Sequence, residues 1–316
     1  MNEHLKLLNG FVGFANRLAG WPDFLSKEGY ILYWVGPSYM LSDGRKVNPD
    51  LLFVSARLNH SLIVECKSGV TADAAQLQTL RATTKDDLIH KAQVTFQAPH
   101  TATFDIAIGC YSQHSTALTK TLDKAGLVFP LLVIDCSAGQ VSLRDGVLNS
   151  KPISALLEKG VELDSDYWPV QFIPYDETSD DAEIAACIIP NIVSTMRSGA
   201  PHLDVTDILR DTCPVSDRLH PTEETQIARR VRSVLRSAAS GEFRGLLRPI
   251  GGGRYHDKWL VSDSIKTGGI PKRVGPRSLN KRTSDFISRL RKGTEFVGYE
   301  DEEETWQYPM DLGTEQ

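Results

Sequence analysis

The sequence predicts an α/β protein, in which a mixed β-sheet flanked by helices is followed by a smaller, basic and mainly helical domain. Two observations lead to this expectation. Short apolar runs that are typical of strands alternate with helical patterns over residues 1–150, as in a mixed sheet. The chain has 316 residues, which is long enough for two domains of ordinary size.

The first elements follow from apolar spacing and from the residues that interrupt it. Apolar side chains recur at helical spacing through residues 4–19, and the Gly-Trp-Pro sequence that follows ends this predicted helix. Residues 30–35 are rich in aromatic and β-branched side chains and predict a strand, which Gly36 and Pro37 end.

A β-hairpin is predicted over residues 48–69, because two apolar runs lie on either side of a polar turn at residues 57–60. Side chains two apart on a strand share a face, so Glu65 and Lys67 point the same way. Folding the hairpin back through this turn brings Asp50 roughly level with Lys67, with a slip of a residue or two left open because the turn type cannot be read from the sequence. Two acids and an ammonium group therefore converge at one edge of an apolar sheet.

A helix over residues 71–92, capped by Thr71, is predicted after the hairpin and carries Gln76 near its start. The pattern then predicts a strand at residues 104–109, a helix at 115–125 and a second strand at 127–134. An edge strand or hairpin is predicted at 140–148.

Charged groups at the end of an apolar sheet are unfavourable unless they pair with one another or hold a metal ion. Two carboxylates make a hard-oxygen site for Mg²⁺, which takes only one or two protein carboxylates and keeps several waters. Phosphodiester hydrolysis suits this set, because the ion lowers the pKa of a bound water and a nearby lysine offsets the charge of the transition state. The alternative is a structural salt bridge between Lys67 and Asp50, worth about 1 kcal/mol if it is exposed.

The motif Pro49-Asp50, then Glu65-Cys66-Lys67, resembles that of the PD-(D/E)XK nuclease superfamily, which has the restriction-endonuclease-like fold. The resemblance covers about residues 1–140. It implies that Asp50 and Glu65 hold Mg²⁺, for which Mn²⁺ can substitute, and that Lys67 is catalytic. Many members add a Gln or Lys from the next helix and an acid from the first helix. Gln76 is the candidate for the former role, and Glu3 or Glu28 for the latter.

The charge changes sign along the chain. Residues 218–292 carry eighteen Lys or Arg against six Asp or Glu, whereas the remainder carries seventeen against thirty-four. We therefore predict a connecting helical segment at 151–200, a basic nucleic-acid-binding domain at 201–299 and an acidic tail at 300–316. Helices followed by a hairpin around Gly251–Gly253 give the second domain the outline of a winged-helix domain. Its predicted nucleic-acid contacts are Arg229, Arg230, Arg232, Arg236, Lys258, Lys272, Arg273, Lys281 and Arg282.

Other features narrow the class of protein. No run of apolar residues is long enough for a membrane span, and the five cysteines are widely spaced, which favours a reducing, cytoplasmic compartment without a zinc site. No nucleotide-binding motif is present. The expected function is a Mg²⁺-dependent endonuclease acting on DNA in restriction, anti-phage defence or repair, with a separate ATPase partner. A homodimer is one way for it to cut both strands.

Two alternatives stay open. One is a non-catalytic DNA-binding or adaptor subunit on a nuclease-like fold. The other keeps the chemistry but makes RNA the substrate.

Overall fold

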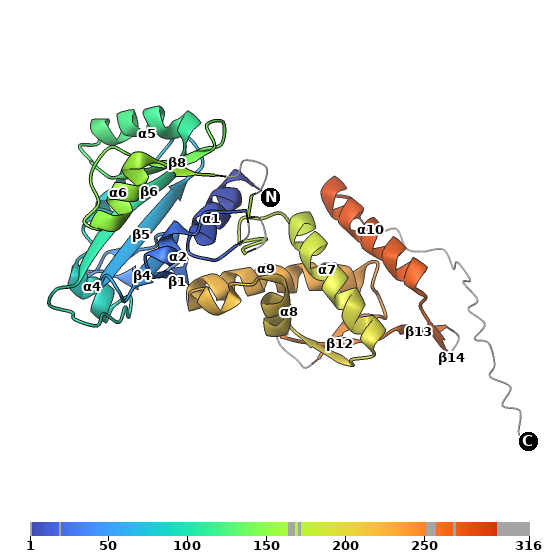
Figure 1. Cartoon of the computed structure of the whole chain (residues 1–316). Helices are drawn as coiled ribbons and strands as arrows, with labels where there is room; N and C mark the ends of the chain where they lie inside the picture. Colours follow the sequence, from blue (N-terminus) through green and yellow to red (C-terminus); the bar gives the residue numbers. More distant parts are fainter. Residues whose placement is uncertain are drawn as a thin grey trace, which may run out of the picture. The chain divides into compact units, whose positions relative to one another are not determined.

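The structure is a computed structural model that describes residues 2–18, 20–163, 168–169, 172–250, 257–267 and 270–295 (Figure 1). Its contacts divide the chain into two compact units. Unit 1 comprises Met1–Glu177 and Cys213–Ile227, and unit 2 comprises Thr178–Thr212 and Ala228–Gln316. This division differs from the predicted boundaries at residues 150 and 200. The predicted acidic tail and the turn around Gly251–Gly253 lie outside the described residues.

Unit 1 is built on a seven-stranded mixed sheet with the strand order β1-β4-β5-β6-β7-β8-β9. The strands are β1 (Tyr30–Val35), β4 (Leu51–Ser55), β5 (His60–Lys67), β6 (Thr103–Tyr111), β7 (Leu131–Asp135), β8 (Gln140–Arg144) and β9 (Val161–Glu162). β5, β6 and β7 run parallel to one another, and the other neighbours are antiparallel. A small hairpin of β2 (Tyr39–Met40) and β3 (Lys46–Val47) precedes β4. The predicted mixed sheet flanked by helices is confirmed.

Helices cover both faces of the sheet (Figure 1): α1 (Glu3–Phe14), α2 (Phe24–Lys27), α3 (Ala74–Arg81), α4 (Lys85–His90), α5 (Ser112–Lys124) and α6 (Lys151–Lys159). On one face, leucines of α3, α4 and α5 form a buried core with Ile63 and Ile108 of the central strands. On the other face α1 packs against β5 and β6. There Phe11 lies so close to Gly109 that a β-carbon would come within 2.3 Å of the ring, so only glycine fits at this position.

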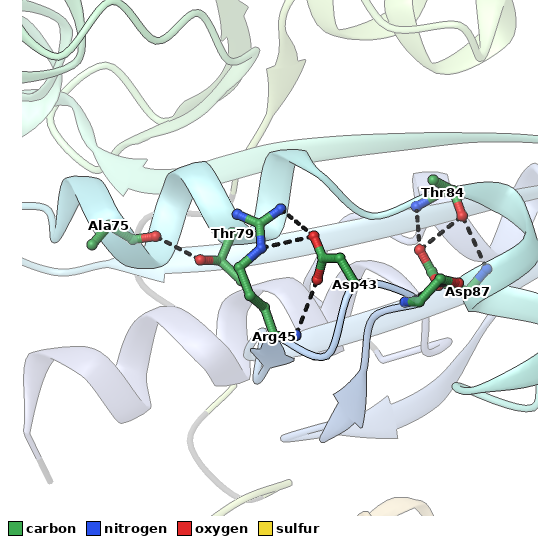
Figure 2. Close-up of polar contacts among 7 residues, drawn as sticks. Asp43, Arg45, Ala75, Thr79, Thr84 and Asp87 are labelled. Carbon is green, nitrogen blue, oxygen red and sulfur yellow. Dashed lines mark hydrogen bonds and ion pairs between the residues drawn. The ribbon is translucent and has the colours of Figure 1, made fainter.

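The predicted single helix over residues 71–92 is wrong, because the structure contains two short helices. Asp73, not Thr71, caps α3 and accepts hydrogen bonds from the amides of Ala75 and Gln76. The helix is interrupted at residues 82–84. Thr84 then caps α4 in a reciprocal capping box with Asp87, which Figure 2 shows. The apolar spacing continued through this break and concealed it, whereas the capping box was readable as a helix start.

A buried polar network connects the strands of the sheet at the ends where β1 and β5 begin. Nδ1 of His60 lies 2.9 Å from the hydroxyl of Tyr30, which in turn donates to Ser150 at 3.0 Å. Nε2 of His60 lies 3.1 Å from Oδ2 of Asp105, and both side chains are almost fully buried. Asp105 also accepts hydrogen bonds from the amides of Asn149 and Ser150. The network therefore links β1, β5, β6 and the start of α6.

A segment from late in the chain also belongs to unit 1. Residues 213–227 contain a short 3-10 helix (Ser216–Arg218) and the start of α9 (Pro221–Ser240). Leu219 forms a parallel bridge with Val35, and the amide of His220 donates to the carbonyl of Val35 at 2.9 Å. Cys213, Val215 and Leu219 are buried. The segment therefore lines the edge of the sheet at β1.

Unit 2 contains α7 (Asp181–Ser198), α8 (Val205–Thr212), the rest of α9 and α10 (Pro276–Lys292). Three short strands form an antiparallel sheet in the order β10 (His202–Asp204), β12 (Lys258–Val261), β11 (Leu247–Pro249). A separate hairpin pairs β13 (Ser264–Thr267) with β14 (Ile270–Arg273). None of the described helices is long and apolar enough to cross a membrane.

A buried ion pair holds α10 in unit 2. The guanidinium of Arg289 donates to both carboxylate oxygens of Glu242, at 2.7 and 3.0 Å. The side chain of Glu242 is 2% exposed, and Arg289 also contacts Ser237 near the end of α9. This two-point contact gives α10 a defined position against α9.

Candidate functional site

The register of the hairpin places the two acids of the motif side by side. Ser55 pairs with His60 and Leu51 with Val64, so Asp50 lies opposite Glu65 at the end of the ladder. Asp50 is therefore level with Glu65, two residues from Lys67 and at the limit of the slip of one or two residues that the sequence left open. The cause is the turn, which occupies residues 56–59 because Ser55 accepts from the amide of Leu58 and His60 already belongs to β5.

Backbone contacts on both sides hold Asp50 in place. Its Oδ2 accepts a hydrogen bond from the amide of Cys66 at 2.6 Å. Its carbonyl accepts one from the amide of Gly36 at 2.8 Å, and Gly36 has the positive φ of 59° that favours glycine. The first acid of the motif is thus fixed by β5 on one side and by the end of β1 on the other.

Lys67 connects the second acid to the following helix. Its Nζ donates to Oε1 of Glu65 at 2.7 Å and to Oε1 of Gln76 at 3.2 Å. Glu65 and Lys67 share the sheet face of Ile63, which α3 covers, and Gln76 lies in the first turn of α3. The structure therefore brings together all four residues that were predicted for the catalytic site.

Burial and repulsion perturb the acid at the centre of this group. The side chain of Glu65 is 2% exposed, and burial, followed by the charge of Asp50, raises the pKa of Glu65 to about 7 despite the opposing effect of Lys67. Burial alone would lower the pKa of Lys67, but the charge and hydrogen bond of Glu65 raise it overall, so the ammonium stays charged. Oε2 of Glu65 has no hydrogen-bond partner among the described residues.

A histidine that the sequence did not single out also reaches this site. Nε2 of His4, in the first turn of α1, lies 3.6 Å from Oδ1 of Asp50. Burial alone would lower the pKa of His4, but its contact with the negatively charged Asp50 raises it overall, with smaller effects of Asp176 and Glu65. Of the two acids suggested from the first helices, Glu3 pairs with Lys6 and Glu28 with Arg57.

The late segment of unit 1 adds a further carboxyl group. Glu223 in α9 lies against Gly36, where a β-carbon would come within 2.9 Å of its Oε2. Burial, followed by a hydrogen bond with Glu177, raises the pKa of Glu223 to about 9, and the charges of Asp176 and Asp50 add to this effect. No sequence signal predicted this neighbour, because Glu223 is far from the motif along the chain.

The residues present fit a hard divalent cation. A pocket of about 60 Å³ opens beside Glu65, which is enough space for a few water molecules. No group of three or more His, Cys, Asp or Glu side chains within the described ranges is arranged to hold a metal ion. Mg²⁺ needs only one or two carboxylates besides its waters, and Asp50 with the buried, unpartnered Oε2 of Glu65 could supply that set.

The predicted nucleic-acid contacts all lie in unit 2, and ion pairs engage several of them. Arg230 pairs with Asp181, Arg232 with Asp257 and Arg273 with Asp263. Arg282 donates to the carbonyl of Glu242. The exposed members of the set are Arg229, Arg236, Lys258, Lys272, Arg273 and Lys281. Arg229, Arg232 and Arg236 follow helical spacing and share one side of α9.

Comparison with known proteins gives a match to a family model. A family model described as the MJECL32 domain matches residues 3–146, a span that contains Asp50, Glu65, Lys67 and Gln76 and ends before unit 2. The chain matches no curated protein and no solved structure. The similarity therefore concerns the sheet and the candidate site of unit 1.

Proposed function

We propose that this chain is a metal-dependent nuclease that hydrolyses phosphodiester bonds in DNA. The observation that carries the proposal is the group at the end of β4 and β5, where Asp50 and Glu65 lie side by side and Lys67 contacts Glu65. One oxygen of the buried Glu65 has no described partner. Leaving a buried carboxylate oxygen without a partner is unfavourable, and a bound cation would satisfy it.

Each residue of the group has a role in this chemistry. A bound Mg²⁺, held by Asp50 and Glu65, supplies polarisation of the phosphoryl oxygen and a water of lowered pKa. The hydrogen bond from Cys66 orients Asp50 for binding. Lys67 remains charged next to Glu65 and offsets the negative charge that develops on the phosphoryl group. Gln76 restricts the position of that ammonium through the contact with its Oε1.

The order of elements in unit 1 supports a restriction-endonuclease-like fold. A helix and a strand precede the β4–β5 hairpin, and Glu65 and Lys67 lie on its second strand. The helix α3 follows them, as the resemblance to the PD-(D/E)XK superfamily implies. The first acid stands where β4 begins and the second acid stands near the end of β5. The restriction, defence or repair context and a separate ATPase partner rest on this resemblance alone.

Unit 2 would supply affinity for the DNA backbone. Its order of α7, β10, α8, α9, β11 and β12 supports a winged-helix domain, in which two helices are followed by a β-hairpin. The exposed cations of α9, β12 and β14 suit phosphate contacts. Arg230 and Arg232 contribute less than predicted, because Asp181 and Asp257 already neutralise them.

Cleavage assays test the proposal. The purified chain is incubated with supercoiled plasmid, linear duplex, single-stranded DNA and RNA, in Mg²⁺, Mn²⁺ or EDTA. We expect metal-dependent cleavage of DNA, abolished in Asp50→Asn, Glu65→Gln and Lys67→Met. The matched control is Lys124→Met, because α5 begins where β6 ends and its exposed last residue, Lys124, lies about three turns away from that end of the strand.

Two results would overturn the proposal. The first is cleavage that all three variants retain. The second is the absence of cleavage under every condition together with identical metal-binding calorimetry for wild type and Asp50→Asn, which is the behaviour of an adaptor. Cleavage of RNA alone would keep the chemistry and change the substrate.

A further inference from the structure

The pocket beside Glu65 has a polar rim that the proposed chemistry does not use. It is lined by Lys46, Val47, Asn48, Pro49, Glu65, Gln76 and Leu80. Val47, Pro49 and Leu80 are buried and form an apolar floor, whereas Lys46 and Asn48 are exposed at the rim. The pocket therefore joins the carboxyl group of Glu65 to an ammonium and an amide contributed by the β3 strand and the chain just after it.

Among the residues that the structure describes, no acidic side chain forms an ion pair with Lys46. Its neighbour Arg45 donates to Asp43 through Nε and Nη2, at 2.8 and 2.6 Å, as Figure 2 shows. Lys46 pairs through its backbone with Met40 in the small hairpin, but its side chain makes no ion pair or hydrogen bond with any other residue that the structure describes. Burial, followed by the charge of Lys46, lowers the pKa of His220, so the field of this ammonium reaches the late segment that borders the site.

The size of the pocket restricts what the rim can bind. At about 60 Å³ it lies well below the roughly 300–1,000 Å³ of pockets that enclose a whole ligand such as a nucleoside. A group that binds here lies at the mouth, in reach of Lys46 and Asn48, and is small and anionic. A phosphate of a polynucleotide strand has this character, and the strand itself can continue past the pocket.

Given the proposed nuclease function, on which this step rests, we infer that Lys46 and Asn48 bind a phosphate that flanks the scissile one on the same strand. The scissile phosphate lies against Asp50, Glu65 and Lys67, and its neighbour along the strand lies over the rim. The site thereby favours a polynucleotide over an isolated phosphodiester, since only a polynucleotide carries the second phosphate. Lys46 is a substrate-binding residue and takes no part in the bond cleavage.

The kinetic test compares two substrates that differ in this second phosphate. Wild type, Lys46→Ala, Lys46→Arg and the control Lys124→Ala are assayed on linear DNA and on bis(4-nitrophenyl) phosphate. For Lys46→Ala we expect KM on DNA to rise about tenfold with kcat nearly unchanged. Lys46→Arg should restore most of the affinity, and all four proteins should hydrolyse the small diester at the same rate.

A binding test works without cleavage. In EDTA, the affinity for DNA is measured against salt concentration by fluorescence anisotropy. Loss of one phosphate contact should reduce the slope of log K against log salt by about 0.9 for duplex or 0.7 for single-stranded DNA. The exposed cations of unit 2 remain in every variant, so the difference reports Lys46 alone.

The outcomes separate this inference from the function on which it rests. An unchanged KM on DNA for Lys46→Ala in an active enzyme overturns the subsite and leaves the nuclease intact. If Lys46→Ala loses as much activity on bis(4-nitrophenyl) phosphate as on DNA, the subsite is also overturned, because Lys46 would then act on the scissile group. If wild type hydrolyses neither substrate, and metal-binding calorimetry is identical for wild type and Asp50→Asn, the nuclease proposal fails. The salt slope then still decides whether Lys46 contacts a phosphate.

Discussion

Replacement of Glu65 by glutamine should stabilise the metal-free protein while it abolishes cleavage. Glutamine keeps the shape of the side chain and can still accept the hydrogen bond from Lys67. It removes a carboxylate that is almost fully buried beside Asp50. A site that is assembled to bind a cation is unfavourable when no cation is present, so stability and function should change in opposite directions.

The magnitude follows from the pKa of Glu65. Its folded value is about 7 against an ordinary value of 4.5, so the folded state binds the proton more tightly than the unfolded state. The stabilisation from this proton is fully present below the unfolded pKa and is lost as pH rises through the folded pKa. At about 1.36 kcal/mol per pH unit, ionisation of Glu65 lowers the free energy of unfolding by about 3 kcal/mol at pH 8.

The assay is urea unfolding in EDTA at pH 5 and pH 8. Unfolding is monitored by hydrogen exchange of peptides from β4 and β5, so that unit 1 is observed separately. The free energy of unfolding of Glu65→Gln should exceed that of wild type by about 3 kcal/mol at pH 8 and by less than about 1 kcal/mol at pH 5. Glu158→Gln, at an exposed position on α6, is the matched control. A gain of the same size at both pH values, or no gain at pH 8, would refute the reasoning.

Three further predictions concern other contacts. Asp105→Asn breaks the buried contact with His60 and should lower the free energy of unfolding by about 3 kcal/mol at pH 7. Because burial alone would raise the pKa of Asp105 but His60 and two amides hold it below its usual value, this deficit should shrink in urea unfolding below about pH 4. Arg289→Met leaves Glu242 buried without its partner and should cost about 3–5 kcal/mol in urea unfolding, and Arg289→Met with Glu242→Leu should recover most of it. His4→Ala should raise the Mg²⁺ concentration needed for half-maximal cleavage, and an unchanged metal requirement would exclude His4 from the site.

The central elements of unit 1 were predictable because their signals are local. The strand at residues 30–35, the hairpin around Asp50 and Glu65, and the helix over 112–124 follow from apolar runs and interrupting residues. The contact of Lys67 with Glu65 follows from the two-residue period of a strand. The place of Gln76 beside the site was predictable because α3 begins soon after β5.

Other features depend on tertiary contacts that no local pattern encodes. The exact register was set by Ser55 and by the buried network of His60, which involves residues far along the chain. The approach of His4 to Asp50 depends on how α1 packs on the sheet. A count of arginines in α9 could not show that Asp181 and Asp257 already engage two of them.

The late segment of unit 1 has a consequence for biosynthesis. The edge of the sheet at β1 is lined by Leu219 and His220, and the carboxyl group beside Gly36 comes from Glu223. A ribosome makes residues 178–212, which belong to unit 2, before it makes this segment. Unit 1 therefore cannot complete its fold while the nascent chain is shorter than about residue 227, and closing so long a loop slows that last step. Until then the incomplete unit exposes an open strand edge of the kind on which chaperones and neighbouring nascent chains act.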